Sequence, residues 1–275
     1  MINVNILQKS DRLPVLFVGH GSPMNVLPGN LFYQSWQSLG AQFGQTWSKP
    51  QLILCISAHW LTEGWQLTAM DKPKTIHDFG GFPSVLYEQQ YPAPGWPAAA
   101  VALAGQLCQP GSDLALQLDT QAWGLDHGAW GVLQPMFPAA DIPVIQLSMA
   151  HGHTAAEHFS LGQQLAGLRE QGVLIVASGN IVHNLRALRM DAADGQAYDW
   201  VLEFDQTVAK QIESGDLAAL QDFQKLPTCA LAHPSTEHFL PLLYAAGAVH
   251  ADEPAQFFNA SFQAASISMR SVIWG

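Results

Sequence analysis

The segment PQLILCISAHW, residues 50–60, decides the fold. Residues 52–56 form a short apolar run that follows a proline and lacks polar alternation. Such a run is typical of a strand that is buried on both faces of a parallel sheet. Because His59 comes directly after it, we expect this strand to deliver a histidine to one edge of the sheet.

Two further segments repeat this arrangement of an apolar run and a histidine. PVLFVGHGSP, residues 14–23, ends in His20 between two glycines, and VLIVASGNIVHN, residues 173–184, ends with His183 and an asparagine. Open α/β sheets bind ligands beyond the carboxyl ends of their strands. The three runs therefore predict a metal or acid/base site at one sheet edge, although each histidine taken singly is also compatible with a structural role.

The composition fits one compact domain. The chain has 275 residues, of which 48% are hydrophobic and 12% charged, which favours a globular enzyme-like fold over disorder. The apolar runs alternate with helical patterns, so we expect an α/β fold with a central, mostly parallel sheet flanked by helices. We expect residues 1–275 to form a single domain, present as a monomer or homodimer.

Charge and cysteine content exclude several classes of partner. The formal net charge of −11 argues against nucleic acid and anionic membrane surfaces, and no apolar run approaches ~18 residues. Three widely spaced cysteines without a CxxC pair support neither a zinc knuckle nor a disulfide framework. The N-terminus lacks the pattern of a secretory signal, and we expect a cytoplasmic protein.

The stretch TIHDFGGFPSVLY, residues 75–87, is unusually apolar for a loop. We expect it to cover a pocket for a flat substrate, with His77 and Phe79 among the contacts. The alternative is a packed surface loop.

Several other histidines have a local context that predicts their role. His127 follows Asp126, which we expect either to orient its ring or to make a turn. Three more histidines lie near the start of a helix predicted over residues 154–172, and we expect solvated side chains there: His151, His153 and His158. Ser235 is expected to cap a helix to about residue 246, with His238 in its first turn.

Neutral imidazole is a suitable ligand for zinc, iron, copper and nickel. The candidate ligands His20, His59, His183 and His238 come from four separate elements, so their spacing cannot show that they meet. No GxSxG elbow, GxGxxG fingerprint or phosphate-binding P-loop is present, which leaves metal chemistry as the stronger hypothesis.

Several motifs together resemble the DOPA 4,5-dioxygenase type of extradiol ring-cleaving dioxygenase, in the class III branch that also holds the catalytic subunit of protocatechuate 4,5-dioxygenase. The resemblance covers about residues 14–274. The motifs are GHGSPMN at 19–25, SAHW at 57–60, TIHDFGGFP at 75–83, YPAPG at 91–95, LDHGAWG at 125–131, ASGNIVHN at 177–184 and PSTEHFLPLLY at 234–244.

This resemblance implies a reaction in which both atoms of O2 are inserted into a catechol ring, next to its two hydroxyls. It implies that His20, His59 and His238 bind one divalent ion, Fe(II) for activity or Zn(II) as recorded for several members. His183 would be the active-site base or a further metal ligand, and His127 would lie beside the substrate and assist proton transfer or O2 binding. Arg186, one turn after His183, is our candidate for a substrate carboxylate.

One position departs from the protocatechuate branch, which uses a glutamate as its third ligand. Here Glu237 and His238 are neighbours, and only one of them can face the ion if they lie on a helix. We prefer His238. Two alternatives stay open on the same fold, namely a zinc-dependent hydrolase and a non-catalytic metal-binding relative.

Overall fold

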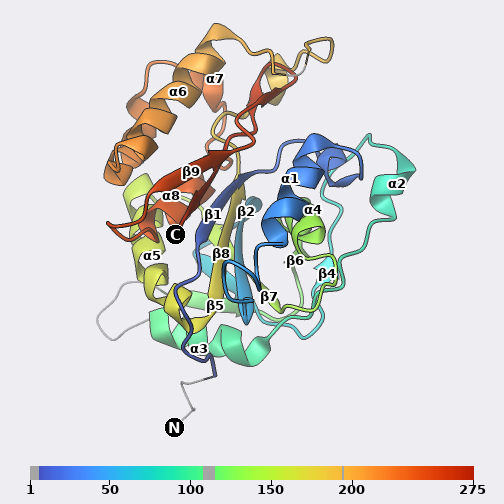
Figure 1. Ribbon diagram of the computed structural model, residues 1–275, viewed down its shortest axis with the longest axis vertical. Helices are drawn as coiled ribbons and strands as arrows, with labels where there is room; N and C mark the ends of the chain where they lie inside the picture. The colour runs from blue at the N-terminus through green and yellow to red at the C-terminus, as the bar shows by residue number, and fades with distance from the viewer. Residues whose placement is uncertain (1–5, 108–114, 194) are drawn as a thin grey trace.

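The structure is a computed structural model that describes residues 6–107, 115–193 and 195–275, so Cys108 lies outside the described residues. Its centre is an eight-stranded sheet with the order β5-β3-β7-β2-β8-β1-β12-β9 (Figure 1). The strands are β1 (Val15–Gly19), β2 (Leu52–Thr62), β3 (Trp65–Thr68), β5 (Leu116–Asp119), β7 (Val144–Ala150), β8 (Val173–Gly179), β9 (Ala255–Phe258) and β12 (Ser271–Trp274).

The middle of this sheet is parallel. Strand β2 pairs in parallel with β7 and β8, and β8 pairs in parallel with β1, while β12, β9 and β3 add antiparallel neighbours. The α/β fold with a mostly parallel sheet is thereby confirmed. Two short ladders lie outside the sheet: β4 (Lys74–Thr75) with β6 (Gly124–Leu125), and β10 (Phe262–Gln263) with β11 (Ile267–Ser268).

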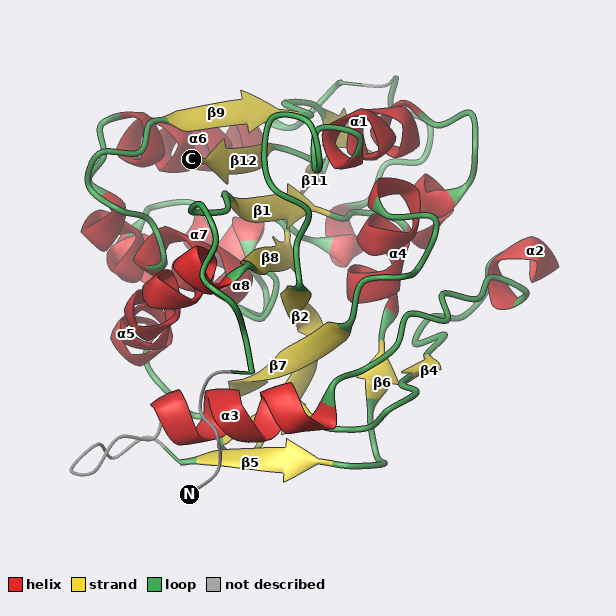
Figure 2. Cartoon of the chain, turned by 60° about the horizontal axis from the view of Figure 1, so that its bottom comes forward, coloured by secondary structure: helices red, strands yellow, loops and turns green. Residues whose placement is uncertain are grey.

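Helices cover both faces of the sheet (Figure 2). The α-helices are α1 (Leu31–Gly40), α2 (Ser84–Tyr87), α3 (Pro97–Leu107), α4 (His127–Met136), α5 (Ala155–Leu165), α6 (Asp199–Glu213), α7 (Cys229–Ala232) and α8 (Leu240–Gly247). Short 3-10 helices are η1 (Pro23–Val26), η2 (Ala166–Gln171), η3 (Leu185–Ala187) and η4 (Leu217–Lys225).

Alternation along the buried strands creates two cores. In β2, Ile53 and Cys55 pack with side chains of α1 and α4, whereas Leu52, Leu54 and Ile56 pack with side chains of α3, α5 and α8 on the opposite face. All five are fully buried. The unbroken apolar run at residues 52–56 therefore reflects a strand with a hydrophobic layer on each side, as predicted.

Three element boundaries differ from the predicted ones. The helix predicted over residues 154–172 ends as α5 at Leu165 and continues as the 3-10 helix η2. Strand β2 continues past residue 56 to Thr62, because its far end pairs with Ala150 after a register shift, so His59 lies within the strand. The predicted cap at Ser235 was wrong, since α8 begins at Leu240 and leaves His238 in the preceding turn. Pro241 explains this start, because proline is tolerated only in a first helical turn.

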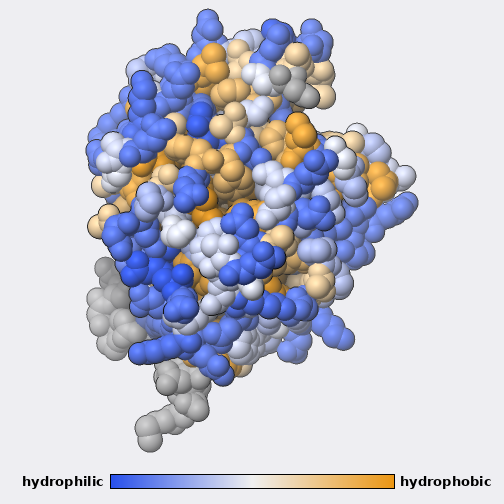
Figure 3. All heavy atoms as spheres, in the orientation of Figure 1, coloured by the Kyte–Doolittle hydropathy of each residue, from blue (hydrophilic) through white to orange (hydrophobic). Residues whose placement is uncertain are grey.

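The visible surface is mostly polar, with apolar patches near its centre and upper right (Figure 3). Among the described residues, no helix has both the length and the apolar character needed to cross a membrane. Cys55 and Cys229 are free and buried.

Candidate metal centre

Four of the predicted site histidines meet at the carboxyl ends of the parallel strands. His20 directly follows β1, His59 lies near the end of β2, and His183 comes shortly after β8. His238 joins them from the turn before α8, where its carbonyl oxygen accepts the Asn180 N–H at 2.8 Å. This hydrogen bond between backbone groups ties the turn that carries His238 to the end of β8.

Three of these side chains form a compact group. The Nε2 atoms of His20 and His59 are 3.1 Å apart, and the ring centroids of His20, His59 and His238 are separated by 5.0 to 5.3 Å. One nitrogen from each of the three lies within 4.8 Å of the others. Nitrogens that each lie ~2.1 Å from one ion are about 3.0–3.4 Å apart, so the His20–His59 pair has the spacing of two ligands.

Burial keeps these rings neutral. Burial lowers the pKa of His59 to about 4, and it lowers the pKa values of His20 and His238 well below the usual range, with further lowering of both by the neighbouring histidines. A neutral ring offers a lone pair to a cation without first losing a proton. The His238 Nε2 atom is also buried without a hydrogen-bond partner, which an ion ligated there would supply. The donor set therefore fits a divalent ion.

His127 completes the cluster from the first turn of α4. Its ring centroid lies 4.0 Å from that of His59 and 5.6 Å from that of His20. Of the two alternatives for Asp126, the local one holds rather than the orienting one: its carboxylate accepts the Ala129 N–H as the cap of α4, and it also accepts from Ser57 Oγ. The carboxylate beside the His127 ring is that of Asp78, 3.0 Å from Nδ1.

His183 occupies a different position from the three grouped histidines. Its ring is stacked on that of His238, with the centroids 3.5 Å apart and the planes 6° from parallel. Neither of the compact groups of possible metal donors among the described residues includes it. Burial lowers its pKa to about 3, so the ring is neutral at physiological pH.

Of the three predicted substrate contacts, Phe79 and His77 lie on the loop of residues 75–83 and Arg186 lies on η3. Phe79 lies edge-on to His127, with the centroids 5.5 Å apart, so this part of the loop borders the cluster. The His77 ring instead packs on Trp130 and bonds the Gln89 carbonyl at 3.0 Å. Arg186 is exposed on η3, and its side chain has no hydrogen bond or ion pair with any described residue.

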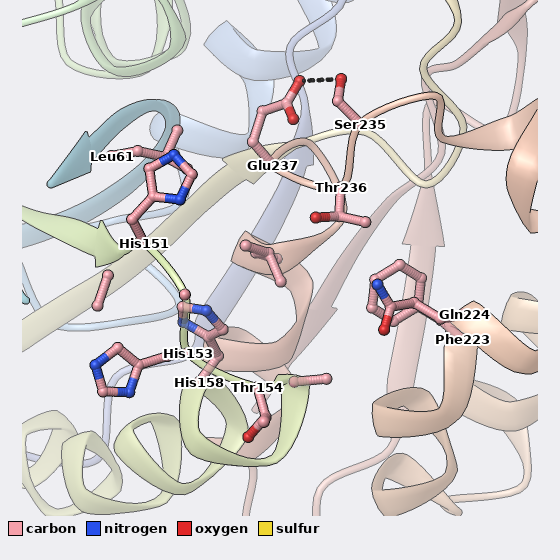
Figure 4. Close-up of a pocket in the computed structure, with 14 residues that line it drawn as sticks. Leu61, His151, His153, Thr154, His158, Phe223, Gln224, Ser235, Thr236 and Glu237 are labelled. Atoms are coloured by element: carbon pink, nitrogen blue, oxygen red, sulfur yellow. Dashed lines mark hydrogen bonds between the residues drawn. The ribbon is translucent and has the colours of Figure 1, made fainter. Parts of the chain in front are cut away.

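A hollow of about 560 Å³ is lined by residues close in sequence to His59 and His238, although not by these histidines themselves (Figure 4). Its wall includes Leu61, two residues after His59, and Glu237, whose carboxylate accepts from Ser235 Oγ. Three further histidines line it from the segment after β7 and from α5: His151, His153 and His158. The expectation that His158 is solvated was wrong, because its buried ring bonds the Tyr244 hydroxyl at 2.7 Å.

Two polar residues of the cluster escaped the sequence analysis. The Asp78 carboxylate lies within 3.2 Å of ring nitrogens of two histidines, and Ser178 Oγ lies 3.0 Å from His20 Nδ1. A usable signal existed for Asp78, since it is the one carboxylate in the TIHDFGGFP motif. Ser178 could have been found from strand register, because parallel neighbours place Ser57 beside Ser178 at the sheet edge.

Comparison with known proteins shows which family this chain belongs to. The sequence profile described as "Catalytic LigB subunit of aromatic ring-opening dioxygenase" matches residues 15–273. The chain is 46% identical to the 4,5-DOPA dioxygenase extradiol of Escherichia coli (strain K12), over 98% of this chain and 97% of that protein. It is 37% identical to the 4,5-DOPA dioxygenase extradiol of Beta vulgaris, over 93% and 94% of the two chains.

A solved structure agrees with these matches. The crystal structure of an uncharacterized protein from Escherichia coli K12 has a TM-score of 0.81 and 41% sequence identity, and the match covers 96% of this chain and all of that one. The profile match spans nearly the whole sheet, including the strands that carry the histidines. The chain therefore belongs to the LigB family of aromatic ring-opening dioxygenases.

Proposed function

We propose that this enzyme is an extradiol dioxygenase that cleaves a DOPA-like catechol between ring carbons 4 and 5. Both atoms of O2 enter the product, and the bond next to the two hydroxyls breaks. The single observation that carries the proposal is the convergence of His20, His59 and His238 in a chain whose curated relatives are named 4,5-DOPA dioxygenase extradiol.

We propose His20, His59 and His238 as the ligands of one divalent ion, with Fe(II) as the active form and Zn(II) as an inactive substitute. When bound, the ion lowers the pKa of the catechol hydroxyls and, as iron, supplies the redox chemistry that O2 requires. The neutral imidazoles leave its double charge to attract a catecholate. Zinc has no redox chemistry, so a zinc-loaded enzyme should bind catechol without opening it.

His183 is the proposed base. Its ring is neutral because burial lowers its pKa to about 3, and it stacks on His238 beside the ion-binding group. From there it takes a proton from a catechol hydroxyl. The stacked placement supports this role over that of a fourth ligand.

His127 is the proposed second proton-transfer residue. Asp78 faces its Nδ1 at 3.0 Å, which leaves Nε2 for the substrate. Phe79 lies edge-on to His127 and would pack on the catechol ring, where it excludes water. We propose Arg186 for the carboxylate of a DOPA-like substrate, because its exposed guanidinium lacks a partner among the described residues. His77 would contribute indirectly, by holding the loop that carries Phe79 in position.

Oxygen uptake tests the proposal. Protein reconstituted anaerobically with Fe(II) should consume O2 when L-DOPA is added and form a yellow ring-opened product, whereas the zinc-loaded protein should not. No O2 uptake with a panel of catechols, together with ester or amide turnover by the zinc form, would favour the hydrolase. The dioxygenase names of the relatives already speak against the hydrolase and against a non-catalytic relative.

Three finer points belong to the same proposal. Metal analysis of anaerobically purified protein should find iron in the active fraction. Size-exclusion chromatography with light scattering should give a monomer or homodimer. We also propose a cytoplasmic location, which fits the buried free thiols of Cys55 and Cys229.

A further inference from the structure

The carboxylate of Asp78 lies against two histidine rings at the edge of the cluster and accepts one backbone N–H. Its Oδ2 lies 3.2 Å from His59 Nδ1, and its Oδ1 lies 3.0 Å from His127 Nδ1. Oδ1 also accepts the backbone N–H of His127 at 2.9 Å. One side chain therefore touches both a proposed metal ligand and a proposed proton-transfer residue.

The Asp78 carboxylate can accept hydrogen bonds from the two rings but cannot donate one, and this determines which nitrogen of each ring carries the proton. The Asp78 carboxylate accepts the backbone N–H of His127, and an aspartate carboxylate is ionised at neutral pH. An ionised carboxylate has no proton to donate, so each ring must place its own proton on Nδ1. In a neutral ring this leaves Nε2 with a lone pair. For His59, that bare Nε2 is the atom 3.1 Å from His20 Nε2.

We propose that Asp78 is a positioning residue that fixes the tautomer and direction of both His59 and His127, and so couples ion binding to proton transfer. The inference rests on the proposed function of the site. Its physical basis is that a carboxylate behind a ligating histidine orients the ring and raises its basicity. The other proposed ligands have different partners, since His20 Nδ1 faces Ser178 and His238 Nδ1 faces Glu237.

A second cation between His59, Asp78 and His127 is the rival interpretation, because their donor atoms also lie within 4.8 Å of one another. Two features favour the hydrogen-bonded arrangement. The backbone N–H of His127 points at Oδ1, where it would face the cation with its own positive end. A second ion would also require His59 to lose its Nδ1 proton while its Nε2 serves the first ion.

The decisive variant is Asp78→Asn. An amide has one accepting oxygen, and its NH2 group donates, so it cannot accept from both rings. If it donates to His59 Nδ1, the ring proton moves to Nε2 and blocks coordination. We expect zinc affinity, measured by chelator competition, to fall by about 10- to 100-fold. At saturating Fe(II), kcat should fall by a similar factor through His127, with a smaller change in KM.

Two further variants separate this role from a general loss of structure. Asp119→Asn is a control for the loss of a hydrogen-bonded carboxylate, because the buried Asp119 accepts three N–H groups, all from the backbone of residues 121–123, and none from a histidine. It should leave zinc affinity and kcat unchanged. Asp78→Glu keeps both carboxylate oxygens and should recover part of the zinc affinity that Asp78→Asn loses.

Wild-type zinc affinity and kcat in Asp78→Asn would overturn the inference, as would two zinc ions per wild-type chain and one in the variant. Coupling to His127 has its own check: adding Asp78→Asn to His127→Ala should slow turnover no further. The affinity comparison does not depend on turnover. A wild-type protein that binds zinc but opens no catechol when it is loaded with Fe(II) would therefore refute the proposed function and still decide the role of Asp78.

Discussion

Replacing Gly179 with alanine should displace His238 without altering any imidazole. Gly179 is the last residue of β8, and a Cβ at this position would overlap the main-chain carbonyl oxygen of His238 and lie 3.1 Å from Pro241 Cγ. The neighbouring bond from the Asn180 N–H to the same carbonyl holds the two chains together. The clash is with backbone, so no side-chain rotation relieves it.

Overpacking a buried position costs typically about 1–3 kcal/mol. If the turn that carries His238 moves to relieve the clash, the cost falls on ion binding, and about 1.4 kcal/mol per factor of ten makes this roughly a 5- to 150-fold loss of zinc affinity. If the turn does not move, the free energy of unfolding of the ion-free protein falls by the same amount. Chelator competition and urea unfolding with and without zinc separate the two results.

Gly105→Ala is the matched control. Gly105 is an exposed residue of α3, and a Cβ there meets nothing within 4 Å. This change should raise the free energy of unfolding by about 0.5–1 kcal/mol and leave zinc affinity as it was. Gly179→Ala protein with wild-type zinc affinity and a wild-type urea midpoint would refute the close approach of β8 to the His238 turn.

Three other predictions concern the histidines and Arg186. His59→Ala should lose the ion, whereas His127→Ala should keep it and lose turnover; full metal occupancy in the first variant, measured by elemental analysis, would count against the ligand assignment. Burial lowers the pKa of His233 to about 4, so the unfolded chain takes up this proton first as pH falls. The stability of the ion-free protein should therefore decrease from pH 6.5 to pH 4, by on the order of 3 kcal/mol from this residue; a flat urea midpoint over that interval would contradict it. Arg186→Ala should raise KM for L-DOPA about tenfold or more and leave KM for unsubstituted catechol unchanged; equal effects on both substrates would argue for another carboxylate receptor.

The sequence was most informative where burial alone sets the structure. Three apolar runs could be predicted as strands buried on both faces without knowing what they pack against. All three are strands of the parallel centre of the sheet: residues 15–18, 52–56 and 173–177. A parallel sheet aligns its carboxyl ends, so the convergence of His20 and His59 followed from strand direction. Neither the prediction of the strands nor that of this convergence depends on where the helices and loops lie.

The loops were harder to predict because their positions depend on short, distant contacts. Asp78 reaches His127 because two residues of β4 pair with two residues of β6. A two-residue ladder leaves no periodic pattern in the sequence. His158 was missed for a similar reason, since the groups that make its burial tolerable come from elsewhere: Tyr244 on α8 and, through the Tyr244 hydroxyl, Trp65 on β3.

The three proposed ligands are neutral imidazoles. Two carboxylates contact these imidazoles from behind and would not touch the ion themselves. Asp78 lies behind His59, and Glu237 Oε1 lies 3.3 Å from His238 Nδ1. An ion held by three neutral imidazoles would keep its double charge available to a catecholate.

The two outer carboxylates should not be equivalent. The Asp78 side chain is 16% exposed and contacts two rings, while that of Glu237 is 26% exposed and also accepts from Ser235 Oγ. Water screens the more exposed charge and can replace its single, longer contact to His238. Glu237→Gln should therefore reduce zinc affinity less than Asp78→Asn does, and it should leave kcat at saturating Fe(II) closer to wild type. The reverse order in the same chelator competition would show that charge near the ion, rather than ring orientation, is what the carboxylates contribute.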